Sequence, residues 1–262
     1  TVVEETRTGA GGAVGAHAVA RLPADGYTLL LASGSMFTVN QYIYDKLPYK
    51  LEDFAPISKV ASGPMVVTVN ADVPARSTRE LLAYIRANPG KMQFASAGTG
   101  SQTHIAGEAF ADAGGLNILH VPYRGEGPGY ADLMAGVVQL AVGNINAIAP
   151  LLKGGRVRAL AVTDLQRSAL LPEGPTVAGS GLPRLELVGW FALLAPTGTP
   201  PSIVARVADD VKQAVREPGM KRYLDEQGMT ASVGGPQALT SDIRLESARW
   251  KALVSKRSIS AN

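Results

Sequence analysis

The sequence MQFASAGTGSQTHIAGEA, from Met92 to Ala109, decides the fold of this chain. Its pattern predicts a strand over residues 92–95, a Gly-rich turn over residues 96–100 and an amphipathic helix from Ser101, an N-cap residue type. The turn and the start of the helix present backbone N–H groups and the positive end of the helix dipole. Carboxylates and phosphates bind at such places, although an ordinary strand-to-helix connection that uses Gly has the same pattern.

Strands and helices alternate on both sides of this stretch, which predicts an α/β fold with parallel sheets. Apolar strands near residues 70–74 and 194–200 end in Pro-containing linkers, which indicates that the chain crosses there between two lobes. We expect one lobe to comprise residues 1–71 and 197–262 and the other to comprise residues 72–196. Strands are predicted at residues 2–5, 27–32, 65–70, 92–95, 118–122, 138–142, 157–163 and 189–194, and three C-terminal helices at 201–215, 218–227 and 236–254.

The composition excludes several classes of protein. The 262 residues are 46% apolar and 18% charged, as in an ordinary globular domain, and no apolar run is long enough for a transmembrane helix. The absence of cysteine excludes disulfides, thiolate metal sites and cysteine nucleophiles. A net charge of +3, from 25 basic and 22 acidic residues, is too small to indicate a nucleic-acid partner, and three histidines argue against a metal cluster.

Small polar residues follow three predicted strands, at residues 33–35, 98–101 and 143–146. Ligands of open α/β sheets bind beyond the carboxyl ends of the strands. These three segments supply N–H, hydroxyl and amide donors but no charged side chain, a set that suits a small carboxylate. Turn chemistry alone is the alternative, since Ser, Gly and Asn favour turns in any case.

Two enzyme-like patterns are weak. The glycines of residues 9–15 form G-x-G-x-x-x-G, but no acidic residue closes the next strand, so a close-packed turn is favoured over a dinucleotide site. Ser101 and His104 share a helix face, yet the G-x-S-x-G motif of a nucleophilic serine is not matched. We expect His104 to donate a hydrogen bond to a ligand or to hold the loop, and His120 to be structural, and we expect no enzymatic activity.

Five segments together resemble the substrate-binding proteins of tripartite tricarboxylate transporters, the Bug-type receptors. These segments are SAGTGSQTHIAGEAF (96–110), HVPYRGEGPGYADLMAGVVQLAVGNI (120–145), GGRVRALAVT (154–163), PTVAGSGLP (175–183) and WFALLAPTGTP (190–200). The resemblance covers nearly the whole chain. It implies a type II periplasmic-binding-protein fold with a ligand cleft between two lobes, in a monomeric periplasmic receptor. Such a receptor captures a small carboxylate without a cofactor and delivers it to membrane permease subunits. An enzyme or a sensory effector domain on a similar scaffold is the alternative.

The resemblance also implies which residues bind the ligand, with no catalytic or metal-binding residue among them. They are Ser33, Gly34 and Ser35 in the first lobe, and Gly98, Thr99, Gly100, Ser101, His104, Tyr123, Asn144, Asn146 and Ala147 in the second.

The family pattern and this sequence differ at the beginning. Family members have a further strand, a Gly-Gly loop and a helix upstream of the stretch that Val2 begins, and that strand lies inside the first sheet. We therefore expect a protein of these residues alone to be unstable, aggregation-prone or held together by a partner chain. If the sequence is instead part of a longer chain, we expect an empty strand position beside residues 27–32. Gly179 and Ser180 also replace an acidic and a small residue of the family pattern.

Overall fold

The chain has an α/β fold, as expected, and divides into two compact units in a computed structural model that describes residues 2–182 and 185–261. Unit 1 comprises Thr1–Ala61, Trp190–Met220 and Ala231–Asn262. Unit 2 comprises Ser62–Gly189 and Lys221–Thr230. The functional lobes, with boundaries near residues 71 and 196, stay a prediction.

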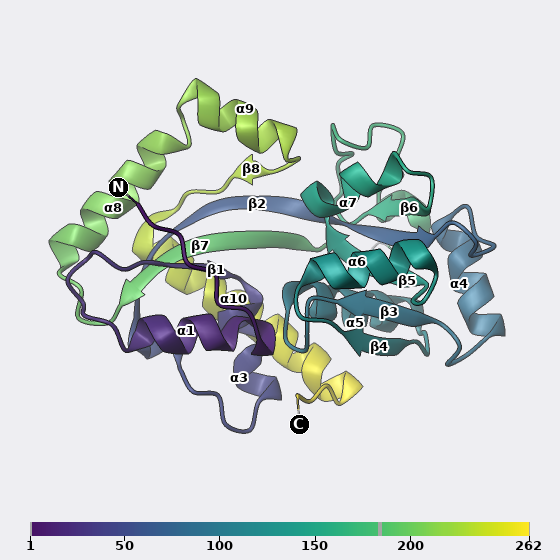
Figure 1. The fold of residues 1–262 in the computed structure, drawn as a ribbon, viewed down its shortest axis with the longest axis horizontal. Helices are drawn as coiled ribbons and strands as arrows, with labels where there is room; N and C mark the ends of the chain where they lie inside the picture. Colours follow the sequence, from purple (N-terminus) through teal and green to yellow (C-terminus); the bar gives the residue numbers. More distant parts are fainter. Residues whose placement is uncertain (1, 183–184, 262) are drawn as a thin grey trace. The chain divides into compact units, whose positions relative to one another are not determined.

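Unit 1 contains a small sheet with helices packed on it (Figure 1). β1 pairs antiparallel with β7, and β7 lies next to β2. The elements that lie wholly or partly in unit 1 are η1 (Ala10–Gly12), α1 (Ala13–Ala20), β1 (Leu30–Ser33), α2 (Ser35–Thr38), α3 (Asn40–Ile43), η2 (Leu51–Asp53), β2 (Phe54–Asn70), β7 (Val188–Pro196), α8 (Pro201–Ala214), α9 (Pro218–Glu226), β8 (Thr230–Ala231) and α10 (Gly235–Arg257).

One edge of β1 is open in the part of the chain that the structure describes, because β1 pairs there with β7 alone. The empty strand position beside residues 27–32 stays a prediction. The strand predicted at residues 2–5 is not formed, and Val2 and Val3 are 97% and 85% exposed. An isolated extended segment has no neighbour to accept its ladder hydrogen bonds, so apolar β-branched residues alone do not make a strand.

Unit 2 contains a five-stranded sheet in the order β6-β2-β5-β3-β4. β3 pairs parallel with β4 and β5, as predicted, whereas β2 pairs antiparallel with β5 and β6. The prediction of parallel sheets is wrong for β2, because a strand shared by two units does not enter the sheet through a local strand–helix–strand crossover. The other elements are α4 (Thr78–Ala87), β3 (Gln93–Ser96), α5 (Gln102–Gly114), β4 (Leu119–Pro122), α6 (Glu126–Ala135), β5 (Leu140–Asn144), α7 (Ile145–Leu152), β6 (Val157–Val162) and η3 (Ala178–Ser180).

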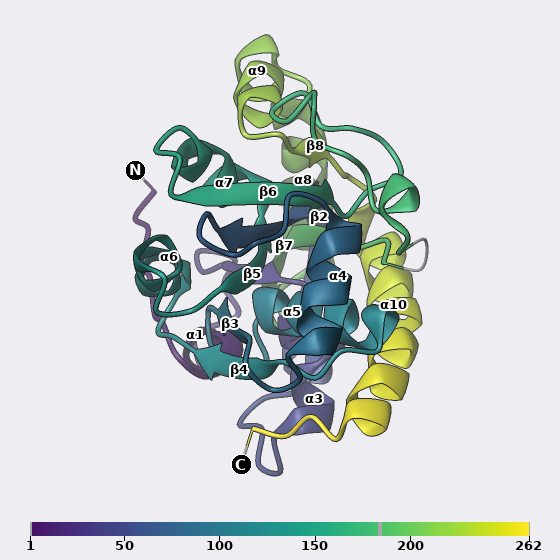
Figure 2. The ribbon, with the colours of Figure 1, turned by 90° about the vertical axis from the view of Figure 1, so that its right-hand side faces the viewer.

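Helix α5 is buried along most of its length, and not on one face as the amphipathic prediction required. It packs on β3 and β5, and Figure 2 shows α6 on one side of these strands and α4 and α5 on the other. Gly107 permits the close packing, because a Cβ there would lie 2.2 Å from the ring of Phe94, which is fully buried. The helix start is therefore fixed against the ends of the strands.

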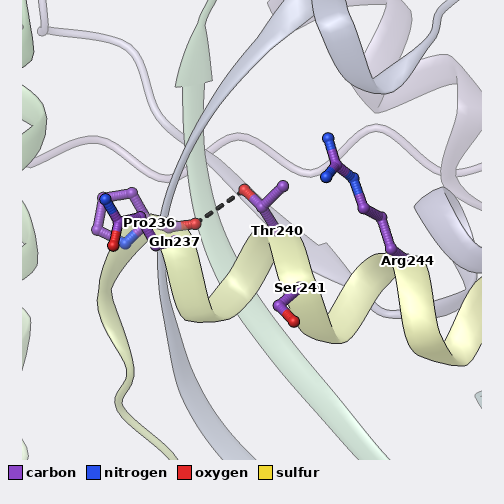
Figure 3. A pocket seen from close by; sticks show the side chains of 5 residues that line it. All are labelled: Pro236, Gln237, Thr240, Ser241 and Arg244. Carbon is purple, nitrogen blue, oxygen red and sulfur yellow. Dashed lines mark hydrogen bonds between the residues drawn. The ribbon is translucent and has the colours of Figure 1, made fainter.

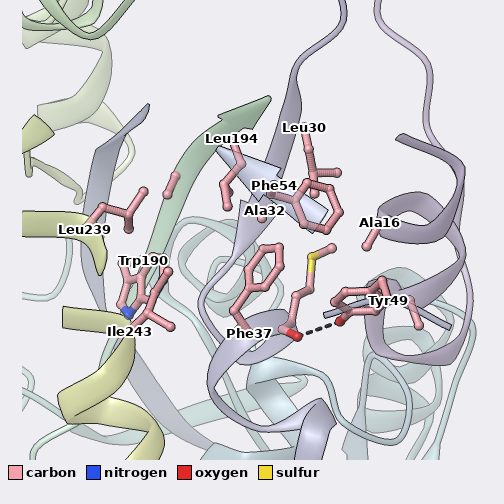
Figure 4. Close-up of a cluster of buried hydrophobic side chains, with 13 residues drawn as sticks. Ala16, Leu30, Ala32, Phe37, Tyr49, Phe54, Trp190, Leu194, Leu239 and Ile243 are labelled. Atoms are coloured by element: carbon pink, nitrogen blue, oxygen red, sulfur yellow. Dashed lines mark hydrogen bonds between the residues drawn. The ribbon is translucent and has the colours of Figure 1, made fainter. Parts of the chain in front are cut away.

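The core of unit 1 is organised by three aromatic rings, as Figure 4 shows. Phe37, Tyr49 and Phe54 meet edge to face, with ring centroids 5.2–6.1 Å apart, the arrangement that ring quadrupoles favour. The Tyr49 hydroxyl donates a hydrogen bond to the backbone oxygen of Met36, which satisfies the polar end of a buried side chain. These contacts fix α2 and the loop that begins it.

We predict that Phe37→Ala lowers the free energy of unfolding by about 3–5 kcal/mol, because it removes a buried ring and leaves a cavity between Tyr49 and Phe54. Urea unfolding measures the change. Leu245→Ala, at a side chain that is 71% exposed on α10, is the control and should change stability by less than about 0.5 kcal/mol. Equal effects of the two variants would contradict this description of the core.

Candidate functional site

The Gly-rich turn between β3 and α5 satisfies most of its backbone N–H groups internally. Ala97 donates to the Thr103 hydroxyl at 2.9 Å, Gly98 to the Ser96 hydroxyl at 3.1 Å, and Gly100 to Nδ1 of His104 at 3.1 Å. Gly98 and Gly100 have φ angles of 118° and 82°, a region that other residues rarely adopt. The turn is thus rigid, and fewer of its donors face a ligand than the sequence indicated.

The first turn of α5 supplies the donors that remain. Ser101 is the N-cap, as predicted, and its hydroxyl accepts the N–H of His104 at 3.2 Å. The N–H groups of Gln102 and Thr103 precede it in the helix and have no intrahelical acceptor. Together with the helix dipole they make this end of α5 attractive to an anion.

A buried histidine, His104, and a half-buried one, His120, support the turn. The rings of His104 and His120 stack with centroids 3.8 Å apart, and Phe94 stacks against them. Burial, and then the neighbouring His120, lower the pKa of His104 to about 3, and burial lowers the pKa of His120 to about 4. Both rings are therefore neutral at pH 7. Because Nδ1 of His104 accepts the N–H of Gly100, its proton is on Nε2, which lies 3.9 Å from a carboxylate oxygen of Glu108.

These contacts give His104 one of the two roles expected of it, and its hydrogen bond to a ligand stays a prediction. The ring holds the loop, and its Nδ1 is used by Gly100. His120 has the structural place that the sequence indicated, because its Nε2 lies 2.6 Å from the Ser96 hydroxyl, which itself accepts the N–H of Gly98. Each histidine thus fixes one glycine of the turn.

A chain of three side chains joins the beginnings of three helices in unit 2. Nε2 of Gln102, at the start of α5, donates to Oδ1 of Asn144 at 3.0 Å. Nδ2 of Asn144, which precedes α7, donates to the carboxylate of Glu126 at 2.6 Å, and Glu126 begins α6. Asn144 makes no capping hydrogen bond to α7, so the first-turn N–H groups of that helix, around Asn146 and Ala147, keep no side-chain cap.

Gln102 and Glu126 are absent from the residues expected to bind ligand. A signal for them exists, since each is the first helical residue after a strand that ends on this edge of the sheet. Gly189 packs against the same place, because a Cβ on it would meet the Gln102 amide. Polar residues in the first turn of a helix after such a strand are therefore candidate ligand-binding residues, as the glycines of the turn are.

The remaining expected site residues have different surroundings. The Tyr123 hydroxyl donates to Asp132 at 2.7 Å, so it is occupied within unit 2. Ser33, Gly34 and Ser35 belong to unit 1, whereas the other expected residues belong to unit 2. Gly34 packs on Trp190, because a Cβ there would lie 2.5 Å from the indole.

Unit 1 also has two hollows that no sequence signal predicted. One, of about 390 Å³, lies along the first turns of α10 and is lined by Pro236, Gln237, Thr240, Ser241 and Arg244 (Figure 3). The other, of about 530 Å³, lies between α10 and α2–α3 and shares Arg244. Neither includes an expected ligand-binding residue. Within residues 2–182 and 185–261, no group of three His, Asp or Glu side chains is arranged to hold a metal, and no helix is long and apolar enough to cross a membrane.

The family model for the receptor of the tripartite tricarboxylate transporter family matches residues 1–259. This chain belongs to that family. Three solved structures are similar to it. The periplasmic binding protein BugD is 31% identical, covering 98% of this chain and 86% of BugD, with a TM-score of 0.89. Rpa4515 of R. palustris, solved with adipate, is 33% identical to this chain. The match covers 95% of this chain and 84% of Rpa4515, with a TM-score of 0.89.

The third structure is MatC of Rhodopseudomonas palustris with bound malate, which is 27% identical, covers 94% of this chain and 85% of MatC, and has a TM-score of 0.86. The resemblance to Bug-type receptors, the two-lobed fold class of periplasmic binding proteins and the receptor function are thereby confirmed. The likeness to solved structures extends over both units, so the turn before α5 lies in a receptor fold.

We predict that the histidine stack makes unit 2 sensitive to acid. Folded-state pKa values of about 3 and about 4 lie below the unfolded value near 6.5, so the unfolded chain binds protons first as the pH falls. The free energy of unfolding should be level above about pH 7 and should fall below about pH 6.5, by up to about 1.4 kcal/mol per pH unit for each histidine, over a shorter pH range for His120.

Urea unfolding between pH 7.5 and pH 4.5 tests this expectation, with His104→Gln beside the wild type. The variant should lose stability at pH 7.5 but show a shallower decline with acid. His17→Gln changes a histidine outside the stack and should keep the wild-type slope. Identical slopes for the wild type and His104→Gln would contradict the buried neutral state.

Proposed function

We propose that this chain binds a small organic carboxylate in the periplasm as a monomer and delivers it to the membrane permease of a tripartite transporter. Membership of the receptor family supports this proposal, as do the carboxylates bound to Rpa4515 and MatC. The observation that carries it is the start of α5, where N–H groups of Gln102 and Thr103 stand at the positive end of a buried helix.

The ligand would be held by dipoles rather than by a cation. A carboxylate oxygen at the start of α5 accepts hydrogen bonds from backbone N–H groups, each of which is stronger for being charge-assisted. The uncapped first turn of α7 offers a second set of N–H groups on the same edge of the sheet. Because the turn at residues 97–101 is already braced by Ser96, His104 and His120, these donors need no rearrangement to accept an anion.

Binding without chemistry is the second part of the proposal. A general base needs a pKa near the working pH and access to the substrate. His104 and His120 have pKa values of about 3 and about 4, and one ring nitrogen of each is hydrogen-bonded, to Gly100 and to Ser96 respectively. We therefore assign both rings to the support of the turn.

A thermal-shift screen tests the proposed function. Succinate, malate, adipate and citrate, each against its chloride control at equal ionic strength, sample di- and tricarboxylates of different length. A ligand at 100 times its Kd should stabilise the folded state by about 2.7 kcal/mol and raise the melting temperature. A cooperative melt that none of the acids shifts would contradict carboxylate capture.

We predict that Gly98→Val abolishes binding of whichever acid gives a shift. Gly98 has a φ of 118°, and a side chain there would also approach the backbone oxygen of Tyr123 to 3.1 Å, so the turn must move away from its position at the start of α5. Calorimetry measures the loss.

Gly179→Val is the matched control, because Gly179 has an ordinary φ and open space where its Cβ would lie. It should keep the wild-type affinity. Unchanged affinity in a folded Gly98→Val protein would move the site away from this turn.

A further inference from the structure

Glu126 is an unusual residue to find beside an anion site. It begins α6, directly after Gly125, whose φ is 102°, and its carboxylate accepts the Asn144 amide at 2.6 Å. No Lys or Arg in the described ranges 2–182 and 185–261 forms an ion pair with it. A half-buried carboxylate without a cationic partner is costly, and burial accordingly raises the pKa of Glu126.

The charge of Glu126 fixes the direction of both amides beside it. An ionised carboxylate accepts hydrogen bonds only, so Asn144 must turn its NH₂ group toward Glu126 and its oxygen toward Gln102. Gln102 must then turn its NH₂ group toward Asn144. Asn144, whose amide the sequence analysis offered to a ligand, has used one donor on Glu126, and Gln102 has used one donor on Asn144.

A second polar group, the Tyr130 hydroxyl, lies beside Glu126. The Tyr130 side chain is 7% exposed, and its hydroxyl interacts with the Glu126 carboxylate. Burial raises the pKa of Tyr130 well above its usual value, and the charge of Glu126 and a hydrogen bond to it add to the rise. Tyr130 and Asn144 are neutral, so neither balances the charge of Glu126, and a ligand donor can do so.

We propose that Glu126 is a specificity-determining residue, which makes this receptor select acids that carry a hydroxyl or ammonium group near a carboxylate over the unsubstituted acids. The inference rests on the proposed function. The ligand's carboxylate accepts hydrogen bonds from the N–H groups at the start of α5. The ligand's hydroxyl or ammonium group donates a hydrogen bond to the Glu126 carboxylate. A ligand ammonium would also neutralise the unpaired charge, whereas a second carboxylate placed at Glu126 is repelled.

The test uses two matched series of acids, measured by calorimetry at pH 7.5. The first is succinate, L-malate and L-aspartate, and the second is glutarate, L-2-hydroxyglutarate and L-glutamate. In each series the carbon chain and terminal carboxylates stay the same while the donor changes. We expect the better of the two substituted acids in at least one series to bind about tenfold more tightly than its unsubstituted parent. The substituent that wins identifies the donor as hydroxyl or ammonium.

Glu126→Gln removes the charge and keeps the shape of the side chain. We expect the preference for the substituted acid to shrink to about threefold or less, while the unsubstituted acid binds as well as before or better. Glu126→Ala provides a second variant if Glu126→Gln melts without cooperativity. Glu173→Gln, at an exposed glutamate of the same unit, is the control and should keep the full preference.

The outcomes separate this inference from the proposed function. If the unsubstituted acids bind as tightly as the substituted ones to the wild type, or if the preference survives in both folded Glu126 variants, the role of Glu126 is wrong and the receptor function stands. If no acid of either series binds, and the wider carboxylate screen is also negative, both proposals are wrong.

Discussion

The burial of α5 is the constraint on which the candidate site depends. Gly107 lets the helix approach Phe94 so closely that no side chain fits between them, and Phe94 in turn stacks on the two histidines. Those rings hold Gly100 and the Ser96 hydroxyl that anchors Gly98. A helix packed in this way cannot shift its first turn without disturbing the core, and its N–H groups are therefore fixed in place before any ligand arrives.

Most backbone N–H groups of the Gly-rich turn already have hydrogen-bond acceptors within unit 2. A Gly-rich segment before a helix indicates a group of free backbone N–H donors. In this chain the N–H groups of Ala97, Gly98 and Gly100 donate instead to side chains of the same unit. The glycines contribute conformation, through their positive φ angles, and the helix start contributes donors. The distinction matters because a rigid turn with few free donors selects where an anion lies more than it selects which anion is bound.

The sequence predicted the features that depend on local chemistry. The strand, turn and helix at residues 92–109, the N-cap Ser101 and the structural place of His120 follow from residue types and spacing. It failed where distant partners decide the outcome. The direction of β2 depends on its partners β5 and β6. Residues 2–5 form no strand because they have no neighbouring strand. Nδ1 of His104 accepts a hydrogen bond from Gly100 because the φ angles of the turn place that N–H beside it. Glu126 and Gln102 were missed because their meeting through Asn144 requires three strand ends to be aligned.

Backbone donors and side chains have different tasks in such a site. Any sequence that forms α5 in this position supplies the same N–H groups, so at the proposed site they would recognise a carboxylate without distinguishing one acid from another. Adipate in Rpa4515 and malate in MatC are bound by proteins that share this fold, with TM-scores of 0.89 and 0.86 to this chain. Selectivity must then come from side chains placed beside the common donors.

The first helical residues are well suited to this, because they lie next to the N–H groups and can change without altering the turn that precedes them. In this chain those residues are Gln102 and Glu126, and the latter adds a negative charge where the backbone favours an anion. At the proposed site, the negative charge of Glu126 repels a carboxylate and weakens the binding of every unsubstituted acid. A ligand that donates a hydrogen bond to Glu126 removes this repulsion.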